Sequence, residues 1–278
     1  MSFVRPAHLE QALDHLARDR WCVLAGGTDV YPAHVDRPIA RPVLDISGLR
    51  ELEGIEPTGD GIRIGALARW SDVLRADLPP AFDALKQAAI EVGSVQIQNA
   101  ATVAGNLCNA SPAADGVPPL LALDASVDVA SRRGRRRLPL RDFVTGYRAT
   151  ALDTDELVTA IVVPAKAAAG ISHFRKLGAR KYLVISIAMV AVRLVAERGK
   201  VVQARVAVGA CTPVALRLES LERDLIGMPL DRIGDAVQED HLDPLRPIDD
   251  IRAPASYRRE AAGVLVRRSL AAAAAGLP

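Results

Sequence analysis

The sequence is poor in cysteine, and its three cysteines lie far apart. Among 278 residues only Cys22, Cys108 and Cys211 carry a thiol. An odd, scattered set argues against a disulfide framework, and it cannot supply the closely spaced ligands of a zinc or iron–sulfur site. The sequence therefore predicts no metal site of its own and a cytoplasmic location.

Aromatic residues and long apolar runs are also scarce. Phe, Trp and Tyr make up 4% of the chain, so alanine, valine, leucine and isoleucine must build the core. No apolar run approaches the roughly 20 residues that span a bilayer. The first residues, Met1 to Pro6, lack the apolar stretch of a signal peptide. We therefore expect no membrane partner.

Neither sign of charge predominates. The chain has 35 Lys and Arg against 33 Asp and Glu, a net charge of +2, whereas phosphate binding usually leaves a strong basic excess. We therefore expect no nucleic-acid partner. The basic run 132–137 lies between two strand-like pieces, so we interpret it as a solvated hairpin tip in preference to a phosphate-binding patch.

Apolar periodicity predicts an α/β beginning followed by a mixed region. Helical spacing of Leu9, Ala12, Leu13 and Leu16 indicates an amphipathic first helix. Short strands are predicted at 22–25 and 43–46, and a hairpin turn at 58–61. Further helices are expected at 71–75, 81–92 and 118–123, and further strands around 127–129 and at 156–163. For the helix at 81–92, the predicted buried face is Phe82, Leu85, Ala89 and Ile90.

The last third of the chain follows a different pattern. Two long strands, 187–195 and 201–209, meet at a turn, and the alternating apolar residues of the second predict one covered face. Helices follow, ending with one at 256–273. Strands followed by helices on one face are typical of an α+β module. We place the domain boundary near residue 168.

The most informative short segment is Val23 to Val30, where an apolar strand ends in two glycines, a hydroxyl and a carboxylate. Paired glycines allow a close backbone approach to a ligand and can turn N–H groups towards an anion. By itself the pattern is more often a plain turn. It is neither a Gly-x-Gly-x-x-Gly fingerprint nor a Walker loop.

A second segment, 93–115, holds few charges but many short polar side chains. Such a loop can line a site for an uncharged, hydrogen-bonding ligand, with Asp115 as an acceptor for ribose hydroxyls. The alternative is a compact loop that caps its own backbone. Cys108, inside this segment, is interpreted as a buried structural thiol.

Together these segments resemble a known family. The resemblance rests on LAGGTDVYP and IQNAATVAGNLCNASPAADGVPPLLALDA, followed in order by DELVTAIVVP, HFRKLGARKYLVISIAMVAVRL and PIDDIRAPASYRREAAGVLVRRSL. These are similar to the flavoprotein subunits of xanthine dehydrogenase and carbon monoxide dehydrogenase, which have the PCMH-type FAD-binding fold. The resemblance implies an α+β chain. It would have an FAD-binding domain of two α/β subdomains (1–168) and a smaller C-terminal domain, an antiparallel sheet with helices (169–278).

The resemblance also implies which residues bind FAD. The set is Val23, Leu24, Ala25, Gly26, Gly27, Thr28, Asp29, Val30, Val92, Thr102, Val103, Ala104, Gly105, Asn106, Asp115, Val158, Lys176 and Ile185. Residues 23–30 and 102–106 would hold the pyrophosphate, and Asp115 the adenosine ribose. The backbone of Val158 would touch the flavin, Lys176 would lie near its pyrimidine end, and Ile185 on the ring face. Animal xanthine dehydrogenases have an aromatic residue where this chain has Val92, which puts NAD as the acceptor in doubt.

By this resemblance the chain is an electron-transfer subunit without catalytic residues of its own. Electrons would pass from iron–sulfur clusters on a partner subunit through FAD to NAD or another acceptor. A molybdopterin-containing large subunit would oxidise the organic substrate. One alternative is a self-sufficient flavin-dependent dehydrogenase or oxidase of the same fold. Another is a nucleotide-binding protein that has lost its flavin.

Overall fold

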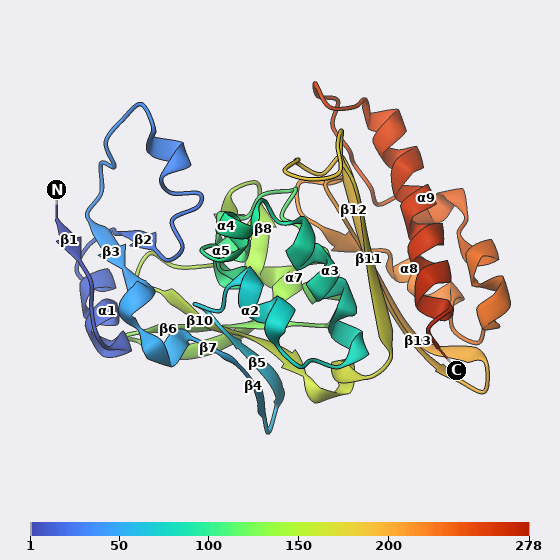
Figure 1. The fold of residues 1–278 in the computed structure, drawn as a ribbon, viewed down its shortest axis with the longest axis horizontal. Coiled ribbons are helices and arrows are strands. Elements are labelled where there is room, and N and C mark those ends of the chain that lie inside the picture. The colour runs from blue at the N-terminus through green and yellow to red at the C-terminus, as the bar shows by residue number, and fades with distance from the viewer. Residues whose placement is uncertain (1, 278) are drawn as a thin grey trace.

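The computed structural model describes residues 2–277 and shows three layered regions along one long axis (Figure 1). The N-terminal region is a small parallel sheet with strand order β1-β3-β2, packed on one helix. Its elements are β1 (Phe3–Val4), α1 (Leu9–Leu16), β2 (Cys22–Leu24) and β3 (Val43–Asp45). The apolar positions predicted for the first helix are all buried in α1. Short 3-10 turns follow at Pro32–His34, Ile46–Gly48 and Arg50–Leu52.

The middle region is a five-stranded antiparallel sheet with the order β4-β5-β10-β6-β7. Its strands are β4 (Ile55–Thr58), β5 (Gly61–Gly65), β6 (Ser126–Ser131), β7 (Gly134–Pro139) and β10 (Leu157–Pro164). Its helices are α2 (Trp70–Arg75), α3 (Asp83–Glu91), α4 (Val95–Gln98), α5 (Val103–Asn109), α6 (Val117–Ala122) and α7 (Leu140–Phe143). A two-stranded ribbon joins β8 (Val144–Gly146) to β9 (Ala149–Thr150).

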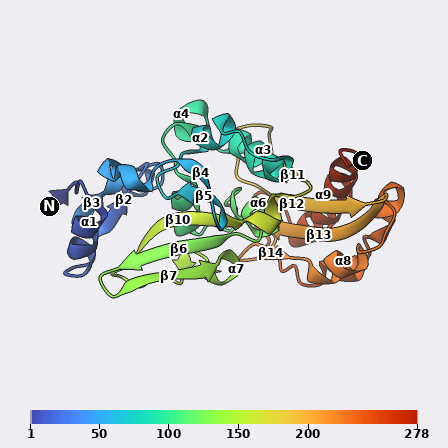
Figure 2. The ribbon, with the colours of Figure 1, turned by 90° about the horizontal axis from the view of Figure 1, so that it is seen from below.

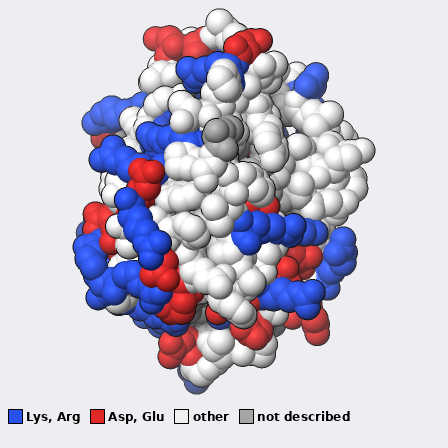
Figure 3. All heavy atoms as spheres, turned by 90° about the vertical axis from the view of Figure 1, so that its left-hand side faces the viewer, with Lys and Arg blue, Asp and Glu red and all other residues white. Residues whose placement is uncertain are grey.

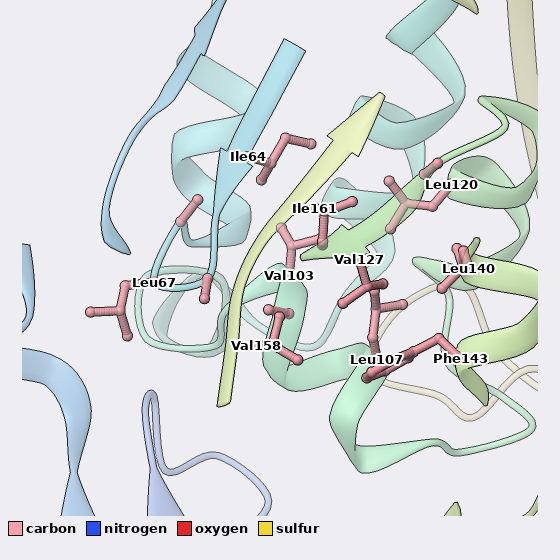
Figure 4. Close-up of a cluster of buried hydrophobic side chains, with 14 of the residues drawn as sticks. Ile64, Leu67, Val103, Leu107, Leu120, Val127, Leu140, Phe143, Val158 and Ile161 are labelled. Atoms are coloured by element: carbon pink, nitrogen blue, oxygen red, sulfur yellow. The ribbon is translucent and has the colours of Figure 1, made fainter. Parts of the chain in front are cut away.

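The core of the middle region forms where helices α5, α6 and α7 meet β10 and its neighbours. Val158 and Ile161 of β10 point towards Val103 and Leu107 of α5 (Figure 4). Because β10 lies at the centre of the sheet, nearly all its residues are buried, as expected for a strand that is covered on both faces. This packing fixes the start of α5 against the first half of β10.

The C-terminal region is a four-stranded antiparallel sheet with the order β11-β12-β13-β14. Its elements are β11 (Ile171–Leu177), β12 (Ala188–Glu197), β13 (Lys200–Gly209), β14 (Leu216–Arg217), α8 (Glu219–Asp224) and α9 (Ala255–Ala274). Short 3-10 turns occur in this region at Leu230–Ala236 and Glu239–Leu242. Two more lie outside it, at Pro80–Phe82 before α3 and at Ala165–Ala168 after β10. Helices α8 and α9 cover the outer face of the sheet (Figure 2).

Strand β12 is apolar on both faces because each face is covered by a different region. Val190 and Val192 pack with α9, whereas Met189 and Ala191 pack with α3 and α6 of the middle region. Side chains alternate along a strand, so successive residues belong to different cores. The sheet therefore joins the middle region to the last helices. The α+β class predicted from the sequence is confirmed.

A charged cluster also joins the middle and C-terminal regions. Asp124, in the turn before β6, accepts hydrogen bonds from Arg205 (Nε to Oδ2, 3.0 Å) and Arg217 (Nη1 to Oδ1, 2.6 Å). Arg193 Nη2 lies 3.6 Å from the same carboxylate, and its side chain is 1% exposed. Removing the carboxylate would therefore leave a buried guanidinium without its counter-charge.

The basic run 132–137 forms the turn between β6 and β7 and the start of β7, as predicted. Four of its five arginines are paired with carboxylates: Arg132 with Glu10 and Asp14, Arg133 with Asp153 and Asp155, Arg136 with Glu156, and Arg137 with Asp60 and Asp128. Figure 3 shows the two signs of charge interspersed on the N-terminal side of the molecule. None of the helices between residues 2 and 277 combines the length and apolar character needed to cross a membrane.

The prediction was wrong for one residue of the helix at 81–92. Ile90 was expected on the buried face of its helix, but it is 52% exposed. The helix buries Ala84, Leu85, Ala88 and Ala89. At 3.6 residues per turn, Ile90 is rotated about 140° from Leu85, which turns it away from the core.

Candidate functional site

A cavity of about 500 Å³ lies where β2, α5 and β10 come together. Most of the residues predicted to bind FAD line it. Its walls are Val23, Ala25, Gly26, Gly27, Thr28, Asp29, Val30, Ile46, Ala66, Trp70, Val92, Ile97, Ala101, Thr102, Ala104, Gly105, Asn106, Cys108, Asn109, Leu152, Glu156, Leu157 and Val158. The size and the mixture of apolar and polar walls suit a small-molecule or cofactor site.

The first wall is the turn that follows β2. A Cβ on Gly26 would lie 2.0 Å from the carbonyl oxygen of Ala100, so only glycine permits this close contact between the two segments. Gly27 has a φ of 72°, a left-handed conformation that favours glycine. The glycine pair thus serves two different needs, a close backbone approach and a turn.

The second wall is helical, although the sequence predicted a loop. Thr102 is the N-cap of α5, and its hydroxyl oxygen accepts a hydrogen bond from Gly105 N at 3.0 Å. Val103 and Leu107 anchor this helix in the core, which turns Ala104, Gly105 and Cys108 towards the cavity. The capping hydroxyl and the apolar i, i+4 pair together explain why a segment rich in small polar residues forms a helix.

Polar contacts tie the two walls together. Asn109 donates through Nδ2 to Oδ1 of Asp29 at 2.9 Å, and it also accepts a hydrogen bond from Arg148. Asp29 and Asn109 are 80 residues apart in the sequence. This link holds the turn after β2 beside α5, so the cavity is bounded before any ligand enters.

A buried carboxylate lies in the third wall. Glu156 precedes β10, and Arg136 donates to both of its oxygens at 2.7 and 2.6 Å. Its side chain is 5% exposed. The Arg136 guanidinium holds the pKa of the Glu156 carboxyl below its ordinary value. The group is therefore ionised near neutral pH and is poorly suited to act as a base.

Five residues predicted to bind FAD do not line the cavity. Leu24 points to the opposite side of β2 from its neighbours, because side chains alternate along a strand. Val103 is fully buried in the core. Asp115, Lys176 and Ile185 lie elsewhere, and Ile185 is 53% exposed. The roles of these five residues stay predictions.

Asp115 and Lys176 are in direct contact, although the resemblance implied roles for them at different parts of FAD. Lys176 Nζ lies 2.6 Å from Oδ2 of Asp115, and the hydroxyl of Ser186 donates to Oδ1 at 2.6 Å. Burial raises the pKa of the Asp115 carboxyl, and the lysine opposes this shift. The ion pair therefore links the segment before α6, in the middle region, to β11 in the C-terminal region.

Several lining residues were missed by sequence reasoning. Trp70 and Ile97 gave no sequence signal, because an isolated apolar residue does not distinguish a cavity wall from the core. Cys108 was interpreted as buried, but it is exposed in the cavity wall, since it follows the fully packed Leu107 on α5. The neighbouring protein raises the pKa of its thiol, so the thiol is neutral near pH 7 and a poor nucleophile.

The cavity fits FAD on two observations that do not depend on the resemblance. The contact between Gly26 and Ala100 brings backbone from two segments to one wall without intervening side chains. The lining also combines the hydroxyl-bearing Thr28 and Thr102 with an apolar part that includes Val92 and Val158, which suits a ligand with both a polar and an apolar end.

Comparison with known proteins agrees with this geometry. Residues 1–166 match the model of the FAD binding domain in molybdopterin dehydrogenase, and residues 172–273 match the CO dehydrogenase flavoprotein C-terminal domain. The chain is 32% identical over 284 residues to the xanthine dehydrogenase FAD-binding subunit of Escherichia coli O157:H7, covering 99% of this chain and 97% of that protein. It is 37% identical over 239 residues to the nicotinate dehydrogenase FAD-subunit of Eubacterium barkeri, covering 82% and 80%.

The fold is shared with solved structures as well. A chain of the Cu,Mo-CO dehydrogenase superimposes with a TM-score of 0.90 at 26% identity, covering 99% of this chain and 98% of that one. With family models matching both parts of the sequence in order, the chain belongs to the FAD-binding medium subunits of the molybdenum hydroxylases.

Proposed function

We propose that this chain holds one FAD in the cavity between β2, α5 and β10 and passes electrons from a partner's iron–sulfur clusters to an external acceptor. The observation that carries the proposal is the cavity itself, which collects residues from two segments 80 positions apart. We propose two domains, 1–168 and 169–278. In support, β10 belongs to the middle sheet and ends at Pro164, and β11 begins another sheet at Ile171.

Within the cavity, we assign the pyrophosphate of FAD to the wall formed by Gly26, Gly27 and Thr102. Here backbone approaches backbone closely, so N–H groups and a hydroxyl are the available partners for phosphate oxygens. We assign the flavin to the more apolar wall that includes Val92 and Val158. The carboxylates of Asp29 and Glu156 are already paired with Asn109 and Arg136, which limits their repulsion of an anionic cofactor.

The proposed partners are an iron–sulfur subunit and a molybdopterin-containing large subunit. When bound, FAD would supply chemistry that joins one-electron carriers to a two-electron acceptor such as NAD⁺. The protein supplies position and a shielded pocket. We also propose a cytoplasmic location, because all three cysteines are unpaired, as is usual in a reducing compartment.

The alternative hypothesis is a self-sufficient flavin-dependent dehydrogenase or oxidase. Such an enzyme would need a general base beside the flavin. Among the described residues that line the cavity, none is His, Tyr or Lys. Of its two carboxylates, Glu156 has both oxygens bound by Arg136, which lowers its pKa and makes it a weak base, and Asp29 accepts a hydrogen bond from Asn109. The site therefore favours electron transfer over direct oxidation of an organic substrate.

The proposal is tested with the purified chain and with the chain co-expressed with its neighbouring subunits. The single chain should bind FAD but not FMN in a 1:1 ratio, and dithionite should bleach the flavin absorbance. It should not oxidise xanthine or an aldehyde. In the complex, substrate should bleach the same flavin. Turnover of an organic substrate by the single chain, with metals shown to be absent, would refute the electron-transfer assignment.

A further inference from the structure

The cavity lining carries negative charge, although the cofactor proposed for it is an anion. Among the described residues that line the cavity there is no Lys, Arg or His, and there are two carboxylates, those of Asp29 and Glu156. The pyrophosphate of FAD adds further negative charge. Like charges repel one another, and the repulsion is stronger inside a protein than in water. The cavity therefore needs positive charge from residues that lie next to its lining.

Two arginines donate hydrogen bonds to residues of the lining. Arg136 donates to both oxygens of Glu156 and so balances that carboxylate directly. Asp29 is different, because within residues 2–277 its side-chain partner is the neutral carboxamide of Asn109, with Nδ2 2.9 Å from Oδ1 of Asp29. The Oδ1 of Asn109 in turn accepts a hydrogen bond from the guanidinium of Arg148. Arg148 therefore reaches Asp29 through a single amide group.

The groups at the two ends fix the direction of this amide. A guanidinium can only donate hydrogen bonds and a carboxylate can only accept them. Asn109 must therefore turn its oxygen to Arg148 and its NH2 group to Asp29, as the two contacts show. Each of these hydrogen bonds polarises the amide in the sense that strengthens the other. Arg148 thus orients Asn109 and partly offsets the negative charge of Asp29.

The ribbon that carries Arg148 holds it at the opening of the cavity. Arg148 lies in the turn between β8 and β9 with a φ of 55°, and its backbone N–H donates to the carbonyl of Ala110, the C-cap of α5, at 2.9 Å. Arg148 and Asp29 are both exposed, and Asp29 lines the cavity, so their contacts with Asn109 lie where the cavity meets solvent. Asp29 also belongs to the turn after β2 to which we assign the pyrophosphate.

We propose that Arg148 is a positioning residue for FAD: it acts through Asn109 to hold and offset the carboxylate of Asp29, and so allows the anionic pyrophosphate to bind beside it. This inference rests on the proposed binding of FAD in the cavity. The competing role is that of a helix cap, because Arg148 Nη1 also lies 3.5 Å from the carbonyl oxygen of Asn109 at the end of α5. A cap stabilises the apoprotein, whereas the electrostatic role changes FAD affinity in a salt-dependent way.

Three variants separate the charge of Arg148 from its hydrogen bonds. Arg148→Gln keeps a side-chain donor and loses the charge, whereas Arg148→Lys keeps the charge and loses the planar guanidinium. The matched control is Arg141→Gln, which makes the same change of charge in α7, at a side chain that is 70% exposed and does not line the cavity. Circular dichroism and the melting temperature of each apoprotein show whether a variant is folded.

The experiment titrates each apoprotein with FAD and measures the Kd by flavin fluorescence at about 0.1 M and about 1 M salt, where the screening length is about 10 Å and about 3 Å. At the lower salt, Arg148→Gln should weaken FAD binding about fivefold, as expected for the loss of one exposed charge contact. At the higher salt, its difference from the wild type should fall below about twofold. Arg148→Lys and Arg141→Gln should bind within about twofold of the wild type at both.

Several results overturn the inference. If Arg148→Gln binds FAD as the wild type does, or is weakened equally at both salt concentrations, the charge of Arg148 does not act on the cofactor. If Arg148→Lys is as weak as Arg148→Gln, the residue has only a structural role. An equal loss in Arg141→Gln would mean that net charge alone matters. Failure of the wild type itself to bind FAD would overturn the proposed function as well, which separates the two cases.

Discussion

Replacing Gly26 by alanine tests the close contact between the two walls of the cavity. The new Cβ would be 2.0 Å from the carbonyl oxygen of Ala100 and 2.7 Å from its carbon. Ordinary contact begins near 3.4 Å, so the turn after β2 and the segment before α5 must separate by about 1.4 Å. Both partners are backbone, so no side-chain rotation can relieve the clash.

The expected effect is on cofactor binding more than on folding. Overpacking by one methyl group typically costs about 1–3 kcal/mol, and each 1.4 kcal/mol is a factor of ten in affinity. Separating the two segments relieves the clash but moves the wall that FAD must contact, so part of the cost appears as weaker FAD binding. We therefore expect Gly26→Ala to weaken FAD binding by about 5- to 100-fold, with a smaller change in the melting temperature of the apoprotein.

The assay is titration of apoprotein with FAD, followed by flavin fluorescence, together with circular dichroism of each variant. The matched control is Gly59→Ala in the turn between β4 and β5, where a Cβ would meet nothing within 4 Å. It should bind FAD as the wild type does. Binding by Gly26→Ala within a factor of about two of the wild type would show that the two backbones need not touch in the FAD-bound form.

Two further predictions concern stability. Asp124→Asn should lower the free energy of unfolding by about 3 kcal/mol, because the buried Arg193 loses its counter-charge; urea unfolding measures this, and a loss no larger than that of the exposed control Asp142→Asn would contradict it. The second concerns acid. Glu156 is ionised and paired with Arg136, which lowers its pKa below the ordinary 4.5. Its stabilising effect is complete above that value and is lost as the pH falls through the lowered pKa. The melting temperature should therefore fall on acidification below about pH 4.5, and less steeply in Glu156→Gln; equal slopes in the two proteins would contradict this.

Local sequence patterns predicted the secondary structure well. The spacing of Leu9 to Leu16, the hairpin turn at 58–61 and the long strands before Gly209 all correspond to observed elements. Such patterns depend on the period of a helix or strand, which neighbouring residues determine. The same reasoning failed at Ile90, where one apolar residue too many was assigned to a face, and at 102–109, where the cap of Thr102 makes a helix out of a predicted loop.

The candidate site was only partly accessible from sequence. The glycine pair and the small polar segment, with their resemblance to a flavoprotein family, identified two walls and the cofactor. Trp70 and Glu156 were missed, because neither residue has a local pattern that distinguishes a cavity wall from a core or a surface ion pair. Cys108 was assigned to the interior for the same reason.

The sequence alone determined most of the helices and strands, the position of the glycine pair after β2, and the family. Only the tertiary structure decided that Gly26 must be glycine because Ala100 lies against it, that Lys176 pairs with Asp115, and that Arg136 binds Glu156 in the cavity wall. These contacts join residues tens of positions apart, and they arise from how the sheets and helices pack. Neighbouring residues determine the period of each element, but the partner of a distant side chain depends on the packing of the whole chain.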